Sequence, residues 1–125
     1  MKNFIVLLIL ILANNSSFGQ ETFTRKDSLQ GGLRFERTCF DVLRYDLNIK
    51  IDIENKYIVG YNQIFFKITT KKSKKIQLDL YQNMQIDSIV FENKKLNYKR
   101  EFNAVFIDFP YYLTLGFDNS LKFYY

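Results

Sequence analysis

The sequence predicts an all-β protein, an antiparallel β-sandwich or saddle-shaped sheet of about seven strands, preceded by a helical signal peptide. Three observations support this fold class. Apolar and polar residues alternate with a period of two along most of the chain, which is typical of strands with one buried face. Polar clusters that favour turns separate the alternating runs. After the first segment, no window of about eleven residues shows a convincing helical period.

The first segment, residues 1–19, has the order of a secretory signal peptide. Lys2 precedes an uncharged apolar run at residues 4–13, and Ser17-Phe18-Gly19 approximates a small-x-small cleavage site. The apolar run is shorter than the roughly 18 to 20 residues that span a bilayer, so we expect cleavage and no stable membrane anchor. The mature chain is then expected to begin at Gln20 and to be secreted, periplasmic or held in the cell envelope.

Residues 20–36 are polar and form the expected lead-in to a β domain at residues 37–125. The first strand of that domain has apolar residues at odd positions and polar residues at even positions, so we expect its odd face to point into the core. The residues expected to point inward are Tyr45, Leu47, Ile49 and Ile51. Residues 52–56 supply the turn that follows.

A longer second strand, residues 57–70, contains Gly60, which suggests a bulge or a close backbone approach. The remaining strands are predicted at residues 76–81, 84–91, 96–100, 105–109 and 121–125. We expect the fourth and fifth strands to form a hairpin around residues 92–95. Pro110 is expected to end the sixth strand, because proline has no N–H to donate to a sheet.

The composition excludes several kinds of catalytic site. The chain contains no histidine, so it has neither an H-E-x-x-H zinc helix nor a Ser-His-Asp triad or Cys-His dyad. The single cysteine, Cys39, cannot form an internal disulfide and is expected to be a small buried hydrophobe. Asp46 and Asp52 lie on the polar face of the first strand, which offers no cleft for a glycosidase. The acids that fit strand ends and turns better than a metal cluster are Asp79, Asp87 and Asp108. We therefore predict no catalytic, cofactor-binding or metal-binding residue.

The basic residues, which give a formal net charge of +5, cluster where turns are expected. The clusters are Lys71, Lys72, Lys74 and Lys75, and the pair Lys94-Lys95. Lysines in turns and on edge strands protect a β protein from edge pairing. Aromatic and basic residues do not interleave as in RNA-binding strands, so no nucleic-acid partner is expected.

Two tyrosine pairs, Tyr111-Tyr112 and Tyr124-Tyr125, leave a binding role open. Exposed tyrosines stack on sugars, and extended peptides bind by strand addition, so the chain could be an independent secreted β-sandwich module for peptide or carbohydrate. The more common alternative is that half-buried tyrosines simply cover the faces of a sheet.

The succession of strands resembles a known family. Residues 45–68 (YDLNIKIDIENKYIVGYNQIFFKI) are similar to the opening of the aminopeptidase N family of zinc metallopeptidases. Residues 76–100 resemble the Leu-x-Leu-Asp and hairpin elements that follow in that family. The segments NAVFIDFP and LTLGFDNSLKFYY resemble its next strands, and ERTCFDVLRYDL is similar to the lead-in of secreted bacterial members. The resemblance covers about residues 37–125.

The resemblance implies an amino-terminal β domain that packs against a thermolysin-like catalytic domain. The family's zinc ligands, its G-x-M-E-N motif and its transition-state tyrosine all lie beyond Tyr125, so none is carried over to this chain. Zinc is implied only for full-length relatives, which remove N-terminal residues from peptides. We therefore expect a non-catalytic domain, truncated before the catalytic domain that would be its partner. We also expect Leu121 to Tyr125 to lack cover and to promote aggregation.

Overall fold

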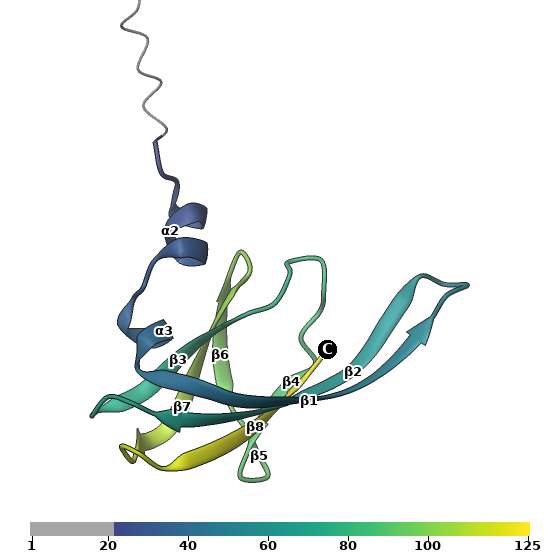
Figure 1. The fold of residues 1–125 in the computed structure, drawn as a ribbon. Helices are drawn as coiled ribbons and strands as arrows, with labels where there is room; N and C mark the ends of the chain where they lie inside the picture. Colours follow the sequence, from purple (N-terminus) through teal and green to yellow (C-terminus); the bar gives the residue numbers. More distant parts are fainter. Residues whose placement is uncertain (1–21) are drawn as a thin grey trace, which may run out of the picture.

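Two antiparallel β-sheets that pack face to face form the body of the protein in a computed structural model (Figure 1). The structure describes residues 22–125, so the predicted signal peptide lies outside them. The larger sheet has the order β1-β2-β8-β4-β5 and the smaller has the order β3-β7-β6, which confirms the all-β sandwich. The larger sheet consists of β1 (Phe40–Asp52), β2 (Tyr57–Ile68), β8 (Asp118–Tyr124), β4 (Ser88–Phe91) and β5 (Lys94–Lys95). The smaller consists of β3 (Ser73–Asp79), β7 (Ala104–Leu113) and β6 (Asn97–Glu101).

The core lies between the two sheets. Alternate residues of β2 and of β7 point into it, because successive side chains of a strand face opposite ways. Phe109 is its centre, with ring centroids 6.0 Å from Phe66 and 5.0 Å from Phe91. The buried cluster also contains Cys39, Ile64, Ile68, Ile76, Ile86, Ile89, Val105, Ile107, Leu113, Leu121 and Phe123. The expectation that Cys39 is a small buried hydrophobe is confirmed.

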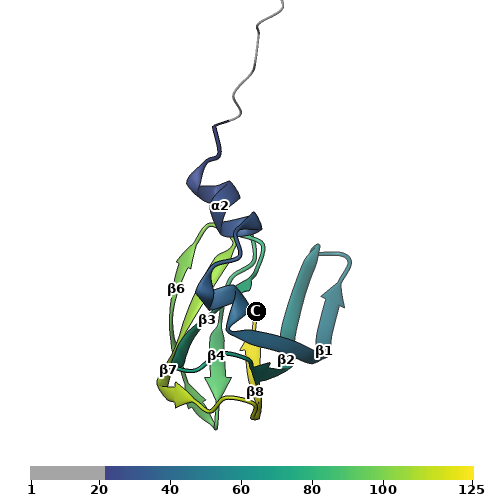
Figure 2. The ribbon, with the colours of Figure 1, turned by 60° about the vertical axis from the view of Figure 1, so that its left-hand side comes forward.

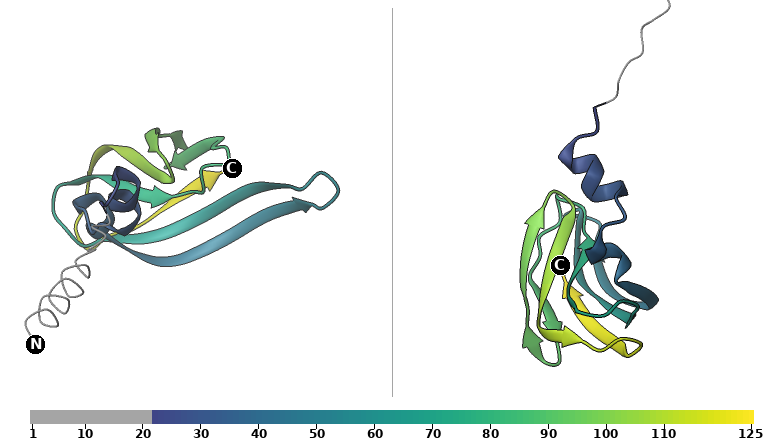
Figure 3. Two further views of the ribbon diagram at one scale, coloured as in Figure 1. Left: turned by 90° about the horizontal axis from the view of Figure 1, so that it is seen from above. Right: turned by 90° about the vertical axis from the view of Figure 1, so that its left-hand side faces the viewer.

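The first strand departs from the sequence prediction. Leu47 and Ile49, expected in the core, are 63% and 44% exposed, and Tyr45 and Ile51 are also exposed. The face is the expected one, because Tyr45 lies opposite the buried Ile64 of β2. The cause is that β1 and β2 extend as a two-stranded ribbon beyond the smaller sheet, as the view from above shows (Figure 3). We call residues 46–61 the distal ribbon, and its side that continues the core face the inner face.

The carboxyl-terminal strand also departs from the prediction. Leu121 and Phe123 are only 1% and 4% exposed. The expectation of an uncovered terminal strand is wrong, because β8 is inserted between β2 and β4 and is paired along both edges. The exposed apolar surface therefore lies on the distal ribbon and not at residues Leu121 to Tyr125.

Two smaller corrections concern the β4–β5 hairpin and strand β7. Only Lys94 and Lys95 pair back onto β4, after which the chain crosses to the other sheet as β6 and pairs with β7. Strand β7 continues through Pro110 to Leu113. A proline is tolerated there because β6 pairs no further than Asp108 and the register of β3 skips this position, so no N–H is required.

The lead-in segment contains two short helices that the sequence analysis did not predict, α2 (Arg25–Gly31) and α3 (Phe35–Thr38). A capping box starts α2: Thr24 accepts from the backbone N–H of Asp27, whose carboxylate accepts from the N–H of Thr24. Leu29 is buried against Ala104 and Phe106, on the face of the smaller sheet that points away from the core. Seven residues are too few for a recognisable period, so the helix depends on this docking.

Candidate binding cleft at the base of the ribbon

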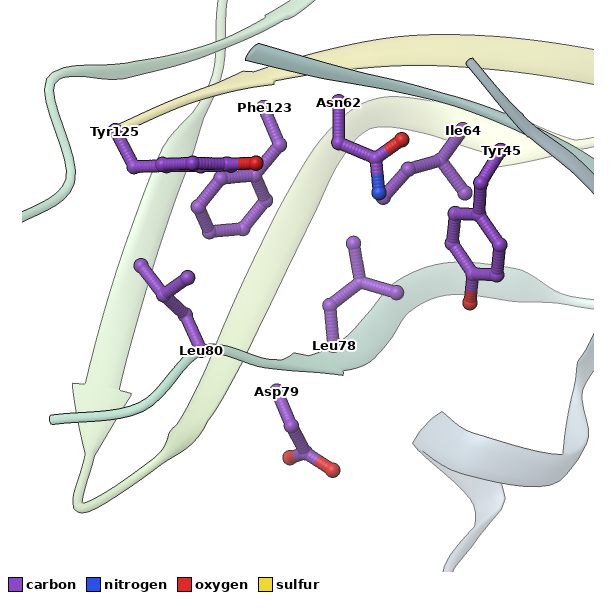
Figure 4. Close-up of a pocket in the computed structure, with 8 residues that line it drawn as sticks. All are labelled: Tyr45, Asn62, Ile64, Leu78, Asp79, Leu80, Phe123 and Tyr125. Carbon is purple, nitrogen blue, oxygen red and sulfur yellow. The ribbon is translucent and has the colours of Figure 1, made fainter. Parts of the chain in front are cut away.

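A small hollow lies where the β1–β2 ribbon leaves the sandwich (Figure 4). It has a volume of about 100 Å³ and opens between the inner face of the ribbon and strand β3. Its lining residues are Tyr45, Asn62, Ile64, Leu78, Asp79, Leu80, Phe123 and Tyr125. The side chains of Leu78, in β3, and of Leu80, just after it, point up into the hollow, and the ring of Tyr125 lies across the opposite side.

The terminal residue is held in place by the strand beside it. Gly60 donates its N–H to the carbonyl of Tyr125 at 2.8 Å and accepts from the N–H of Tyr125 at 3.0 Å. The phenol ring of Tyr125 lies 6.5 Å from the ring of Phe123, centroid to centroid. Tyr125 is therefore a fixed wall of the cleft.

A second, wider hollow adjoins the first on the other side of Tyr125. It measures about 440 Å³ and lies between the distal ribbon and the loop that connects β3 to β4. Its lining residues are Lys56, Tyr57, Ile58, Tyr81, Asn83, Met84, Gln85, Asp87 and Tyr125. The two hollows share Tyr125, and tyrosines line both of them, so we treat them together as a candidate cleft for an extended ligand.

One polar atom in the cleft lacks a partner. The side-chain oxygen of Asn62 is buried and accepts no hydrogen bond from the residues that the structure describes. Leaving such an atom unpaired costs about 1–3 kcal/mol, so a ligand N–H placed here would be favoured. Sequence reasoning missed this residue, although Asn62 is the one polar side chain among the inward positions of β2, and that signal could have found it.

The tyrosine pairs singled out in the sequence do not form joint platforms, because neighbouring residues of a strand face opposite ways. Tyr125 lines the cleft, while Tyr124 lies on the outer face with its ring 5.1 Å from that of Tyr61. Tyr111 and Tyr112 are both exposed on the far end of β7. A hydrogen bond to Glu92 raises the pKa of Tyr111 above its ordinary value, so this phenol stays neutral at pH 7.

The acidic residues stand apart from one another. Asp79 pairs with Arg37 at 2.9 Å and Asp108 pairs with Lys75 at 3.1 Å. Asp46 pairs with Arg44 at 2.9 Å, and Asp52 accepts from Asn55 in the turn. Asp87 lies in the loop before β4 and lines the wider hollow.

Neither metal binding nor thiol chemistry is supported by the side chains of residues 22–125. No three His, Cys, Asp or Glu residues within that range gather where they could hold a metal ion. This donor set does not fit the zinc site that the resemblance implies for full-length relatives. Burial raises the pKa of the Cys39 thiol, which keeps it protonated and unreactive. In the same part of the chain no helix is long and apolar enough to cross a membrane.

The fold is of a kind seen in zinc metallopeptidases. It is similar to part of a two-domain M1 zinc metallopeptidase, solved as a mutant bound to L-arginine, with a TM-score of 0.62 and 18% sequence identity. The match covers 72% of this chain and 21% of that one, so the chain spans about a fifth of the metallopeptidase's length. At this identity the similarity shows the fold alone. No protein-family model matches the sequence, and no curated protein gives a match.

Proposed function

We propose that the chain is a secreted or envelope-located, non-catalytic β domain, equivalent to the amino-terminal domain of aminopeptidase N-like enzymes, and that it binds a catalytic metallopeptidase domain. The observation that carries this proposal is the similarity of the sandwich to part of a two-domain M1 zinc metallopeptidase. The absence of histidine, the residue that binds zinc in an H-E-x-x-H helix, supports the proposal, because such a chain depends on another domain for this zinc chemistry.

The inner face of the distal ribbon is the surface that we assign to the partner. Leu47, Ile49 and Ile51 of β1 form one exposed apolar row, and Ile58 lies directly opposite Ile51 on β2. Scattered exposed apolar residues are common, but a contiguous row marks an interaction surface. The row continues the core face of the sandwich, so a docked domain would extend the existing core.

The experiment has two arms. In the first, the purified chain is tested for zinc content and for chelator-sensitive release from alanyl and leucyl reporters; we expect neither, and measurable release would overturn the non-catalytic assignment. In the second, the chain is mixed with a separately produced catalytic domain of an M1 zinc metallopeptidase. Ile49→Asp should abolish the complex, whereas Asn48→Asp on the opposite face should leave it intact.

A second candidate, an independent module for peptides, is favoured by the cleft. Tyr45, Tyr81 and Tyr125 offer stacking surfaces, and the unpartnered oxygen of Asn62 offers an acceptor for a peptide N–H. The two functions are distinguished by titrating a short alanine peptide into the chain alone. A saturable shift of the Asn62 side-chain amide signal in NMR would favour the module, and an unchanged spectrum would favour the docking domain.

A further inference from the structure

Strand β1 forms one edge of the larger sheet, and its outer edge pairs with no strand in the described part of the chain (Figure 2). A bulge between Val42 and Arg44 interrupts the register at one end, and the turn after Asp52 closes the other. Between these two points lie nine regularly extended residues, 44–52. A long regular edge is a template for another strand, and nothing within this segment blocks pairing as a proline or bulge would.

The side chains of this segment form two rows. The even row, on the outer face, is Arg44, Asp46, Asn48, Lys50 and Asp52. Its charges therefore run positive, negative, neutral, positive, negative. Read backwards, the same row runs negative, positive, neutral, negative, positive. The row is thus complementary to its own reverse, which is the arrangement that an antiparallel copy presents.

We propose that β1 pairs antiparallel with β1 of a second copy of this chain, about a two-fold axis at Asn48. Residue numbers of opposed residues then add up to 96. Arg44 faces Asp52 of the partner subunit and Asp46 faces the partner's Lys50, and each pair occurs twice. On the inner face Leu47 meets the partner's Ile49 and Tyr45 meets the partner's Ile51. The two larger sheets join into one continuous sheet, with a closed and isologous interface.

Neighbouring registers are rejected by the same charges. A slip of two residues in one direction sets Arg44 opposite Lys50 of the partner subunit, and a slip in the other direction sets Asp46 opposite the partner's Asp52. Both place like charges face to face, which is destabilising. A slip of one residue sets the apolar row against the charged row. The register centred on Asn48 also uses all nine regular residues, so geometry and charge select the same pairing.

Contacts within one chain hold these groups on the outer face without using all of their pairing capacity. Lys50 has no ion-pair partner among residues 22–125. The guanidinium of Arg44 lies 4.1 Å from the centre of the Phe65 ring and bonds Asp46 at 2.9 Å, which holds both extended on the outer face. Asp52 accepts two hydrogen bonds from Asn55 and keeps acceptor capacity for a second partner. Views from two directions show this edge on the outside of the molecule (Figures 2 and 3).

The test is a charge exchange followed by analytical ultracentrifugation. The unmodified chain should form a reversible dimer. In the Lys50→Glu variant the new glutamate lies opposite Asp46 of the partner subunit, so two negative charges meet. In the Asp46→Lys variant the new lysine lies opposite the partner's Lys50, so two positive charges meet. Each variant alone should therefore dimerise at least about tenfold more weakly. An equimolar mixture restores every opposite-charge pair and should form the heterodimer. Lys94→Glu makes the same charge change at the other edge of the sheet, on β5, and should leave dimerisation unchanged.

A cross-link tests the register itself. Asn48→Cys places two thiols opposite each other at the axis, within the Cα separation that a disulfide needs, and should give a covalent dimer on mild oxidation. Lys50→Cys faces Asp46 of the partner subunit and should cross-link poorly, and the native Cys39 is fully buried. A monomer at all concentrations, a mixture that stays monomeric, or equal cross-linking of both variants would overturn the proposal. Capture of a foreign peptide by a monomeric chain would also overturn it, because another occupant would then use this edge.

Discussion

At the scale of single residues, Gly60 is where the two long strands and the carboxyl terminus meet. A Cβ added there would collide with the carbonyl oxygen of Asn48 and would lie 2.8 Å from the Cα of Ile49. Neither atom can move without breaking the β1–β2 ladder. The sequence prediction of a close backbone approach at this glycine is therefore confirmed.

We predict that Gly60→Ala lowers the free energy of unfolding by about 1–3 kcal/mol, because the strands must separate to accept the methyl group. Urea denaturation followed by circular dichroism measures the change. Gly31→Ala is the matched control, since a Cβ at Gly31 meets no atom within 4 Å and alanine favours a helix. Equal losses from both variants would contradict the steric account.

Residue-level predictions succeeded where the residue type alone restricts the environment. Cys39 without a partner is most stable when buried, and glycine within a strand marks close packing. The cleft residues Asn62 and Tyr125 could not be paired from the sequence. They line the same hollow only because β8 lies beside β2, and strand order is not encoded in alternation.

At the scale of elements, two carboxylates support α2: Asp27 in its capping box and Glu101 in its contact with the smaller sheet. The salt bridge from Arg25 to Glu101, at 2.8 Å, lowers the pKa of Glu101 below its ordinary value of 4.5. The hydrogen bonds from Thr24 lower the pKa of Asp27 below 3.8 in the same way. A carboxyl group with a lowered pKa in the folded state stabilises the fold above its unfolded pKa and loses that contribution as the pH falls.

We therefore predict that α2 loosens on acidification, between about pH 5 and pH 2, before the sandwich unfolds. Amide signals of residues 25–31 in NMR should broaden or move toward random-coil values, while those of β7 stay in place. Glu101→Gln should show a loosened helix already at neutral pH and a smaller change on acidification. A helix that stays docked at low pH would contradict this role of the carboxylates and would show that the burial of Leu29 and the hydrogen bonds from Arg37 and Gln77 to its carbonyl suffice.

The strands were more predictable than the elements between them. Runs of alternating or strand-favouring apolar side chains located the main strands, because most of these strands turn at least one apolar face toward the protein interior. The same reasoning misplaced the effect of Pro110, since whether a strand needs an N–H there depends on its neighbours. It also missed α2 and α3, whose stability comes from contacts with the smaller sheet and not from an internal period.

At the scale of the whole molecule, the core occupies only the part of the larger sheet that the smaller sheet covers. The sequence identified the apolar face of β1 correctly but not what lies opposite it. Alternation reports which side of a strand is apolar, whereas burial depends on the reach of the second sheet. Leu47 on β1 and Phe66 on β2 share that face, but only Phe66 is inside.

We predict a large difference between these two positions. Phe66→Ala should lower the free energy of unfolding by about 3–5 kcal/mol, because it leaves a cavity against Phe40 and Phe109. Leu47→Asp should change it by only about 0.5 kcal/mol, since the side chain is already in water. Thermal melts at low protein concentration, where the chain is dissociated, measure both. Unfolding by Leu47→Asp would show that the ribbon is covered in the isolated chain.

The central position of β8 has a consequence for how the chain reaches its native state. Strands β2 and β4 do not pair with each other, since each pairs with β8, which follows the other described strands. The register from Tyr61 to Tyr124 closes a long stretch of chain, and such non-local contacts make folding slow. In a chain that lacks residues 118–124, the β1–β2 hairpin and the three-stranded sheet can form, but no strand connects β2 to β4. The larger sheet is therefore complete only once β8 is in place, and until then the apolar faces of β2 and β4 are exposed to aggregation.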